Sequence, residues 1–412
     1  MIDRFYPQPE ELQHVRVGPL GPHIDGFATL VSRQGYCHQN GWQKIRLVAD
    51  LSQWLTRRRI ELTELNERQA VVFLEARWKR VLHHSGEQAT ITLLLRHLRQ
   101  AAVIPPPVAL AVCSPIDSIE QDYGHFLLQE RGVIPVTAGQ YLAAARRFLS
   151  HRFSTGPIKL KNLRPRDVAR FVLHDSSRRG RRSSQLCASA LRSFLSYLFQ
   201  QGRIPTNLAA AVPTVAGWRL SELPRYLEPA QVEKVLRCCD RRRKIGKRDY
   251  AILLLLARLG LRAGEVGGLT LDDIDWSAGE LCVRGKGSRV DRLPLLQDVG
   301  KAIVDYLKKG RPTCLSRHLF IQCKAPYERF ANSGSIGNVA RGALVRAQLD
   351  LPHHGAHVFR HSLATRMLGS GASLAQIGQV LRHQLVQTTE IYAKVNLAAL
   401  RALAQPWPGG AQ

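Results

Sequence analysis

The sequence predicts a mainly α-helical protein with one small antiparallel β-sheet, divided into two or three domains. Its 412 residues exceed the ~150 of a common single domain. Apolar residues recur at helical spacing in both halves of the chain. Two short strands, 281–284 and 292–295, flank Gly285-Lys286-Gly287-Ser288, and the glycines predict the turn of a β-hairpin.

Two proline-marked breaks divide the chain into three segments. Pro105-Pro106-Pro107 forms the first break, and the second runs from Pro213 to Pro224. Proline has no amide donor and cannot continue a helix, which makes both stretches predicted linkers. We therefore expect an N-terminal helical module over 1–105, a second helical module over 114–215, and a third domain over 220–412.

The first two segments resemble each other. Residues 97–112 align with 197–212 at an offset of 100, and residues 61–74 align with 159–172 at an offset of 98. A chance match between two amphipathic stretches is the alternative interpretation. We favour two successive helical modules, in which the first is a degenerate duplicate of the second. The identical positions are Leu98/Leu198, Gln100/Gln200, Ile104/Ile204, Pro105/Pro205, Ala109/Ala209, Ala111/Ala211, Val112/Val212, Leu62/Leu160, Leu65/Leu163, Arg68/Arg166 and Phe73/Phe171.

The third segment predicts helices around the hairpin. Glu228-Pro229-Ala230 is typical of a helix start, and this helix is expected to reach Cys238. Residues 248–259 are nearly all apolar, which predicts a buried helix. More helices are expected after the hairpin, including a tail with helical spacing of Leu and Ala over 396–405.

Charge points to a polyanionic partner. Lys and Arg total 59 against 32 Asp and Glu, which gives a net charge of +27. With 45% hydrophobic and 22% charged residues the chain is expected to fold, and the excess charge must then lie on folded surfaces. Such a field favours DNA, RNA or an anionic membrane. RNA is less favoured, because we find neither a stacking platform nor an RNA-recognition motif.

A membrane is the weakest of these partners. The longest apolar run, Ala251–Ala257, is far shorter than the ~20 residues that span a bilayer. The N-terminus has no apolar region typical of a secretory signal. The eight cysteines form no C-x-x-C pair, and adjacent Cys238 and Cys239 suit neither a zinc site nor a disulfide. We expect reduced thiols, no metal and a cytoplasmic protein.

The third segment contains the groups that metal-free phosphodiester cleavage requires. The transition state gains negative charge, which arginine forks hold well. A nucleophile must attack in line, and an acid must protonate the leaving oxygen. A phenol can attack when nearby cations lower the cost of ionising it. The candidates for these roles are Arg262, Lys286, His357, Arg360, His383 and Tyr392.

Four stretches of this segment resemble motifs of the tyrosine recombinase, or phage integrase, family. LARLGLRAGEVGGLTLDDID (256–275) resembles the first-arginine motif, and CVRGKGSRVDRLPL (282–295) resembles the lysine hairpin. HVFRHSLATRML (357–368) is similar to the H-x-x-R motif, and LRHQLVQTTEIYAKV (381–395) to the closing motif with the second histidine and the tyrosine. The resemblance implies a tyrosine-recombinase catalytic domain, preceded by a helical, SAM-like core-binding domain over 114–215.

The resemblance implies a DNA strand transferase with Tyr392 as its nucleophile. Tyr392 would form a 3′-phosphotyrosyl link to one DNA strand, with Arg262 and Arg360 holding the phosphate oxygens. Lys286 would be the acid for the leaving 5′ oxygen. The family's chemistry uses no cofactor.

The remaining implied roles are supporting ones. His357 would accept or orient the tyrosine proton, and His383 would bond a non-bridging oxygen. Glu265 would brace the arginines from behind, whereas His361 is expected to be structural.

One position departs from the family pattern. Leu381-Arg382-His383 stands where the family usually has Leu-Gly-His, and glycine suits a left-handed helix end. Arg382 is expected either to continue the helix or to contact a phosphate. The basic run RRGRR adds DNA-backbone candidates, with a solvated loop as the alternative. These candidates are Arg178, Arg179, Arg181 and Arg182.

The function expected is therefore site-specific DNA recombination or integration, in a transposon or integrative element. Double-stranded DNA is the expected partner, bound by a homotetramer or a mixed tetramer with sister recombinases, at the nucleoid. Two alternatives stay open. A type IB topoisomerase would use the same residues on one duplex, and a non-catalytic DNA-binding protein could descend from a decayed element.

Overall fold

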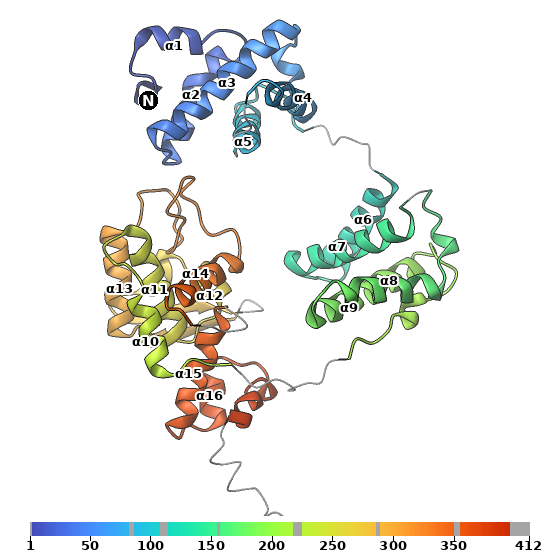
Figure 1. Cartoon of the computed structure of the whole chain (residues 1–412), viewed down its shortest axis with the longest axis vertical. Helices are drawn as coiled ribbons and strands as arrows, with labels where there is room; N and C mark the ends of the chain where they lie inside the picture. The colour runs from blue at the N-terminus through green and yellow to red at the C-terminus, as the bar shows by residue number, and fades with distance from the viewer. Residues whose placement is uncertain are drawn as a thin grey trace, which may run out of the picture. The chain divides into compact units, whose positions relative to one another are not determined.

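The computed structural model describes residues 2–81, 86–107, 114–154, 157–216, 225–285, 289–349 and 355–395. Val108–Ser221 forms one compact unit, and the segments on either side of it make up the other. The residues before 108, those of the middle unit and those after 222 bury three separate cores. Figure 1 shows the helices of each of these parts. As predicted, helices dominate and the described strands form one small antiparallel sheet. None of the described helices is long and apolar enough to cross a membrane.

The N-terminal part is helical and has its own core, which includes Phe27, Leu51, Phe73, Leu94 and Leu98. Helix α4 begins where Asn66 accepts the amides of Arg68 and Gln69. The elements are η1 (Ile2–Arg4), α1 (Pro9–Val15), α2 (Gly21–Arg33), α3 (His38–Arg58), η2 (Leu62–Glu64), α4 (Glu67–Trp78) and α5 (Glu87–Gln100).

The middle unit is also helical. Its helix starts follow from sequence: Ser114 and Asp117 cap the first helix reciprocally, and Pro165 occupies the first turn of another. Its core includes Phe148, Phe171 and Phe194. The elements are α6 (Pro115–His125) with a π-helical continuation (Phe126–Glu130), α7 (Pro135–Arg152), η4 (Leu160–Asn162), α8 (Pro165–Ser177), α9 (Arg181–Gln200) and η5 (Leu208–Ala211).

The C-terminal part packs its helices around α11 (Lys244–Arg258). Residues Ala251–Ala257 are all buried, as the apolar run predicted, although the helix starts four residues earlier than expected. The other helices are α10 (Pro229–Arg237), α12 (Ala263–Gly268), η6 (Leu271–Asp273), α13 (Gln297–Lys309), α14 (Ser333–Arg346), α15 (His357–Gly369), α16 (Leu374–Val380), η7 (Val386–Thr388) and η8 (Glu390–Val395).

The predicted hairpin is present, as β2 (Glu280–Arg284) and β3 (Val290–Pro294). Leu281 pairs with Leu293 and Arg284 pairs with Val290, while a short β1 (Ile274–Asp275), not expected from sequence, adds to β2. Leu281 and Val283 face the core and are fully buried. The sheet therefore anchors the two strands of the hairpin on the helical core, and the predicted turn at 286–288 lies outside the described residues.

The first described residues of the C-terminal part are hydrogen-bonded to α15. The backbone amide of Leu227 donates to the buried Ser362 hydroxyl at 2.7 Å, and that hydroxyl donates to the Val358 carbonyl at 2.8 Å. Because α15 begins at His357, this buried pair of bonds helps to fix the helix that bears two candidate residues.

Replacing Ser362 by Ala should lower the stability of this part by about 1–3 kcal/mol, because the Leu227 amide stays buried without an acceptor. Thermal unfolding of the full chain measures the loss. Ser370→Ala is the matched control, since its exposed hydroxyl also bonds a carbonyl four residues back, and it should change stability by less than about 0.5 kcal/mol. Equal losses in both variants would contradict the role of Ser362.

Candidate active site

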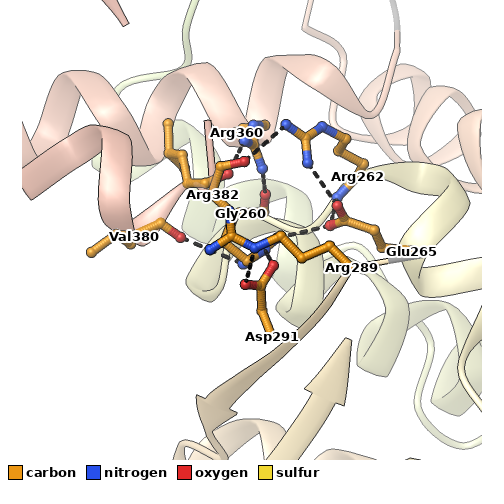
Figure 2. Close-up of polar contacts among 9 residues, drawn as sticks. Gly260, Arg262, Glu265, Arg289, Asp291, Arg360, Val380 and Arg382 are labelled. Atoms are coloured by element: carbon orange, nitrogen blue, oxygen red, sulfur yellow. Dashed lines mark hydrogen bonds and ion pairs between the residues drawn. The ribbon is translucent and has the colours of Figure 1, made fainter. Parts of the chain in front are cut away.

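Most of the predicted catalytic residues lie in the described C-terminal part. Arg262 precedes α12, His357 and Arg360 lie on α15, His383 follows α16, and Tyr392 lies in η8. Lys286 falls outside the described residues. Figure 2 shows how Arg262, Arg360 and Arg382 gather around Glu265 and the Gly260 turn.

The Gly260 turn sets the position of Arg262. Gly260 has φ +58°, and a Cβ atom there would lie 2.8 Å from Leu381 and 2.9 Å from Leu363. Only glycine combines this backbone conformation with such close packing. The chain then enters α12. There the Glu265 carboxylate accepts hydrogen bonds from the backbone amide of Arg262 at 2.8 Å and from its guanidinium at 2.7 Å. Glu265 therefore braces Arg262, as expected.

Arg360 is buried and bound to main-chain oxygens. Its guanidinium donates to the Gly260 carbonyl at 2.5 Å and to the Leu381 carbonyl. Burial, together with the charges of Arg262 and Arg382, lowers the pKa of Arg360 to about 10. Arg360 is therefore still charged at neutral pH, and it links the Gly260 turn to the end of α16.

Arg382 ends α16 in the left-handed conformation that glycine usually supplies. Its φ is +56°, its amide donates to Gln379, and the amide of His383 donates to Gly378, which together form a Schellman motif. The expectation that Arg382 continues the helix is thus wrong. Its side chain is buried and donates to Glu265 at 2.7 Å, and the expected phosphate contact stays a prediction.

His383 is half-buried and oriented by a buried threonine. Its Nδ1 lies 2.7 Å from the Thr389 hydroxyl, and its ring is nearly parallel to that of Tyr392 at 6.4 Å between centroids. Burial lowers the pKa of His383 to about 4, and the charges of Arg360 and Arg262 add to the effect. The side chain is therefore a neutral imidazole at physiological pH.

Tyr392 is 1% exposed and has a partner that sequence reasoning missed. Its hydroxyl lies 3.0 Å from Nδ1 of His361, a residue expected to be only structural. Burial raises the pKa of Tyr392 to about 12, while Arg360 and Arg262 act in the opposite direction. The spacing of His361, four residues after His357, was the available signal, because such residues share a helix face.

His361 is itself held neutral. Burial lowers its pKa to about 4, and His357 and Arg360 contribute to the shift. His357 is exposed at the start of α15, with its ring 6.4 Å from that of His361. The two histidines thus form a row from Tyr392 to the surface.

The other basic candidates lie in the middle unit. Arg178, Arg179, Arg181 and Arg182 are all exposed, at the end of α8 and the start of α9. The Arg179 guanidinium also pairs with Asp175 at 3.0 Å. Their exposure fits the surface run that the sequence predicts, and their contact with DNA stays a proposal.

The neutral histidines predict an acid-sensitive site. His361 and His383 have folded pKa values of about 4, against about 6.5 in an unfolded chain. Folding favours the neutral forms; this stabilisation is complete above about pH 6.5 and is lost as the pH falls toward 4. Thermal midpoints should therefore fall over this range, and less steeply for the double variant His361→Gln/His383→Gln. The same pH dependence of the thermal midpoint in the wild type and the double variant would contradict the lowered pKa values of these two histidines.

Comparison with known families agrees with this arrangement. The model of the phage integrase family matches residues 225–398, and that of the phage integrase N-terminal SAM-like domain matches 121–202. The putative integrase/recombinase y4rA of Sinorhizobium fredii is 43% identical over 396 residues, which cover 96% of both chains. The tyrosine recombinase XerC of Haemophilus influenzae is 32% identical over 57% of this chain and 78% of its own.

Solved structures share the fold at low identity. The XerH site-specific recombinase bound to a palindromic difH substrate has a TM-score of 0.54, with 20% identity over 70% of this chain and 84% of its own. A lambda integrase dimer bound to a core site has a TM-score of 0.53, with 16% identity over 80% and 91%. The described arginines, histidines and tyrosine occupy the part matched by the catalytic-domain family model. The chain belongs to the phage integrase family of tyrosine recombinases, enzymes that cleave DNA and join its strands.

Proposed function

We propose that this recombinase acts through Tyr392, which attacks a DNA phosphate and forms a 3′-phosphotyrosyl link. The observation that carries the proposal is the surroundings of the Tyr392 hydroxyl. It bonds His361 at 3.0 Å, and the charges of Arg360 and Arg262 both favour its ionised form. A buried phenol needs such cations, because burial raises its pKa, here to about 12 with the effect of both arginines included, and a high pKa opposes attack at neutral pH.

Arg262 and Arg360 hold the phosphate in this proposal. Both guanidiniums are already fixed by acceptors of the protein, Glu265 for Arg262 and main-chain carbonyls for Arg360. Such preorganised donors stabilise the extra charge of the five-coordinate transition state without reorganising during the reaction. Neutral His383, oriented by Thr389, donates a further bond to a non-bridging oxygen.

His361 receives the Tyr392 proton in this proposal, in place of His357. As a neutral imidazole its Nδ1 offers a lone pair to the phenol, and its half-buried ring lies beside Tyr392. His357, one helical turn earlier and exposed, passes the proton outward. Because Tyr392 is 1% exposed, η8 must also shift before the hydroxyl can reach a phosphate.

The leaving group completes the reaction. The bond between phosphorus and the 5′ oxygen breaks as the bond to the Tyr392 oxygen forms, and the 5′ oxygen gains a proton. Lys286, which lies in sequence between β2 and β3, supplies that proton in our proposal. A 5′ hydroxyl of another strand then attacks the phosphotyrosine and releases Tyr392. The link conserves the phosphodiester bond energy, and therefore rejoining needs no nucleotide.

We further propose that the protein serves a transposon or integrative element and works as a tetramer, of identical chains or with sister recombinases. Strand exchange between two duplexes involves four cleavages, which is the reason for four protomers. Structures of lambda integrase and XerH were solved on DNA. The segment 396–405 lies outside the described residues, and we propose that it docks on a neighbouring protomer.

We propose that residues 1–105 are a diverged duplicate of the core-binding module, 114–215, ahead of a catalytic domain over 220–412. The repeat in the sequence has a counterpart in the two helical parts: η2 and η4 begin 98 residues apart, as do α4 and α8. Trp54 meets Phe73 edge-on at 5.7 Å, and Phe148 meets Phe171 in the same way at 5.4 Å. The y4rA alignment spans 96% of this chain, and so it includes most of the N-terminal module.

A groove in the N-terminal module supports extra contact with DNA. It has a volume of about 1120 Å³ and lies among α3, α4 and α5. Four exposed arginines line it, namely Arg46, Arg57, Arg58 and Arg80. Arg77 also lines it, but pairs with Asp50 and Glu87. The surplus of lining cations suits phosphate groups.

The triple variant R46A/R57A/R58A should weaken binding of the element's end sequences and lower the salt dependence by about three charges. Covalent cleavage of bound DNA should persist. The matched control R33A/R68A/R96A removes three exposed arginines of the same module that do not line the groove. Fluorescence anisotropy across a salt series measures both. Equal weakening in both variants would assign the effect to net charge rather than to the groove.

The catalytic proposal predicts a covalent adduct. Incubation with nicked suicide duplexes from the element's ends should give a protein–DNA band that survives SDS, and Tyr392→Phe should abolish it. Intact paired sites should then yield recombinants. Supercoil relaxation without recombinants would favour the topoisomerase activity instead. Bound DNA with no adduct across all end sequences would contradict catalysis by this chain alone.

A further inference from the structure

Arg382 combines two features that each cost free energy. Its backbone has φ +56°, a conformation in which the Cβ atom of a non-glycine residue is crowded by the backbone. Its side chain is also charged and 5% exposed, which removes most of its hydration. Glycine at this position would avoid both costs, and the arginine side chain must therefore contribute interactions that offset them.

The first interaction is with Glu265. The terminal nitrogen of Arg382 donates to Glu265 Oε2 at 2.7 Å, within a pair in which both side chains are 5% exposed. Burial alone would raise the pKa of Glu265, but the Arg262 amide and the charge of Arg382 hold it below its usual range. The carboxylate is thus ionised and shared between the two arginines.

The second interaction is with Asp291 of the β2–β3 hairpin. Nε of Arg382 is buried without a hydrogen-bond acceptor and lies 3.9 Å from Oδ2 of Asp291. Asp291 belongs to β3, where it pairs with Val283 of β2, and its other oxygen accepts from Arg289 at 3.0 Å. Arg382 therefore stands between the arginine cluster and the hairpin strand, as Figure 2 shows.

We infer that Arg382 is a positioning residue that ties the β2–β3 hairpin, through Asp291, to the cluster of Glu265 and Arg262. The inference rests on the proposed function, because Lys286 lies in sequence between β2 and β3. Arg382 fixes β3 through Asp291, and its left-handed backbone sets where the chain continues to His383. The leaving-group step therefore depends on Arg382, although its guanidinium touches no reacting atom.

The test compares two substrates that differ in their leaving group. In the first, an ordinary nicked duplex, the 5′ oxygen needs a proton as it departs. In the second, sulfur replaces that bridging oxygen; a thiolate leaves without a proton, which removes the need for a correctly placed acid. A positioning role in proton delivery is thereby separated from general damage to the site.

Arg382→Gly should cleave the ordinary substrate about 10²-fold more slowly than the wild type, the scale of a misplaced catalytic group. It should cleave the sulfur substrate within about threefold of the wild type. Glycine suits the left-handed backbone, and Glu265 keeps Arg262 as its partner. Asp291→Asn should give the same pattern, and the double variant should be no slower than Arg382→Gly, since both changes break one connection.

Arg59→Gly is the matched control. Arg59 also ends a helix in the left-handed conformation, with φ +54°, but its side chain is exposed in the N-terminal module. It should cleave both substrates at the wild-type rate.

Three outcomes decide the matter. Wild-type cleavage of both substrates by Arg382→Gly, or equal slowing on both, overturns the inference. Failure of the sulfur substrate to rescue Lys286→Ala overturns the lysine role on which the inference rests. Adduct formation by Tyr392→Phe would instead overturn the proposed function itself.

Discussion

The site depends on the buried carboxylate of Glu265. Three guanidiniums, those of Arg262, Arg360 and Arg382, lie close enough that the other two lower the pKa of Arg360. Bringing like charges together in a poorly hydrated region is unfavourable unless a counter-charge is present. Glu265 supplies it through bonds to Arg262 and Arg382. The cluster can then stay assembled and positive, which a phosphate-binding site requires.

The same positive field acts on every titratable group beside it. It acts together with burial on His383, whose pKa falls to about 4, and against burial on Tyr392, whose pKa is about 12. The histidines are therefore neutral, able to accept or donate one proton. For Tyr392 the same charges offset part of the rise in pKa that burial causes. In the proposed mechanism, one arrangement of charge thus acts on the proton acceptor, the nucleophile and the phosphate site together.

The sequence allowed most candidate site residues to be predicted, but not the contacts between them. Arg262, Arg360, His383 and Tyr392 could be picked out because their order along the chain is distinctive and the chemistry limits the choices. The bond from His361 to Tyr392 could not, because it joins residues 31 apart across a packed interface. Arg382 was misjudged for a related reason. Local propensity disfavours its backbone conformation, and only the tertiary pairing with Glu265 offsets that preference.

The two helical parts carry side chains of opposite charge at one matching position. Arg77, on the N-terminal module, pairs with Asp50 and Glu87, whereas Asp175, 98 residues later, pairs with Arg147 and Arg179. The sign at the position is reversed, yet each side chain still joins its helix to a neighbouring one. Such a position accepts a charge of either sign, as long as an opposite charge lies beside it. Buried apolar residues such as Phe73 and Phe171 form the core of each part. Under the proposed duplication, the two modules can therefore differ in surface charge, and with it in their partners, while their cores keep similar packing.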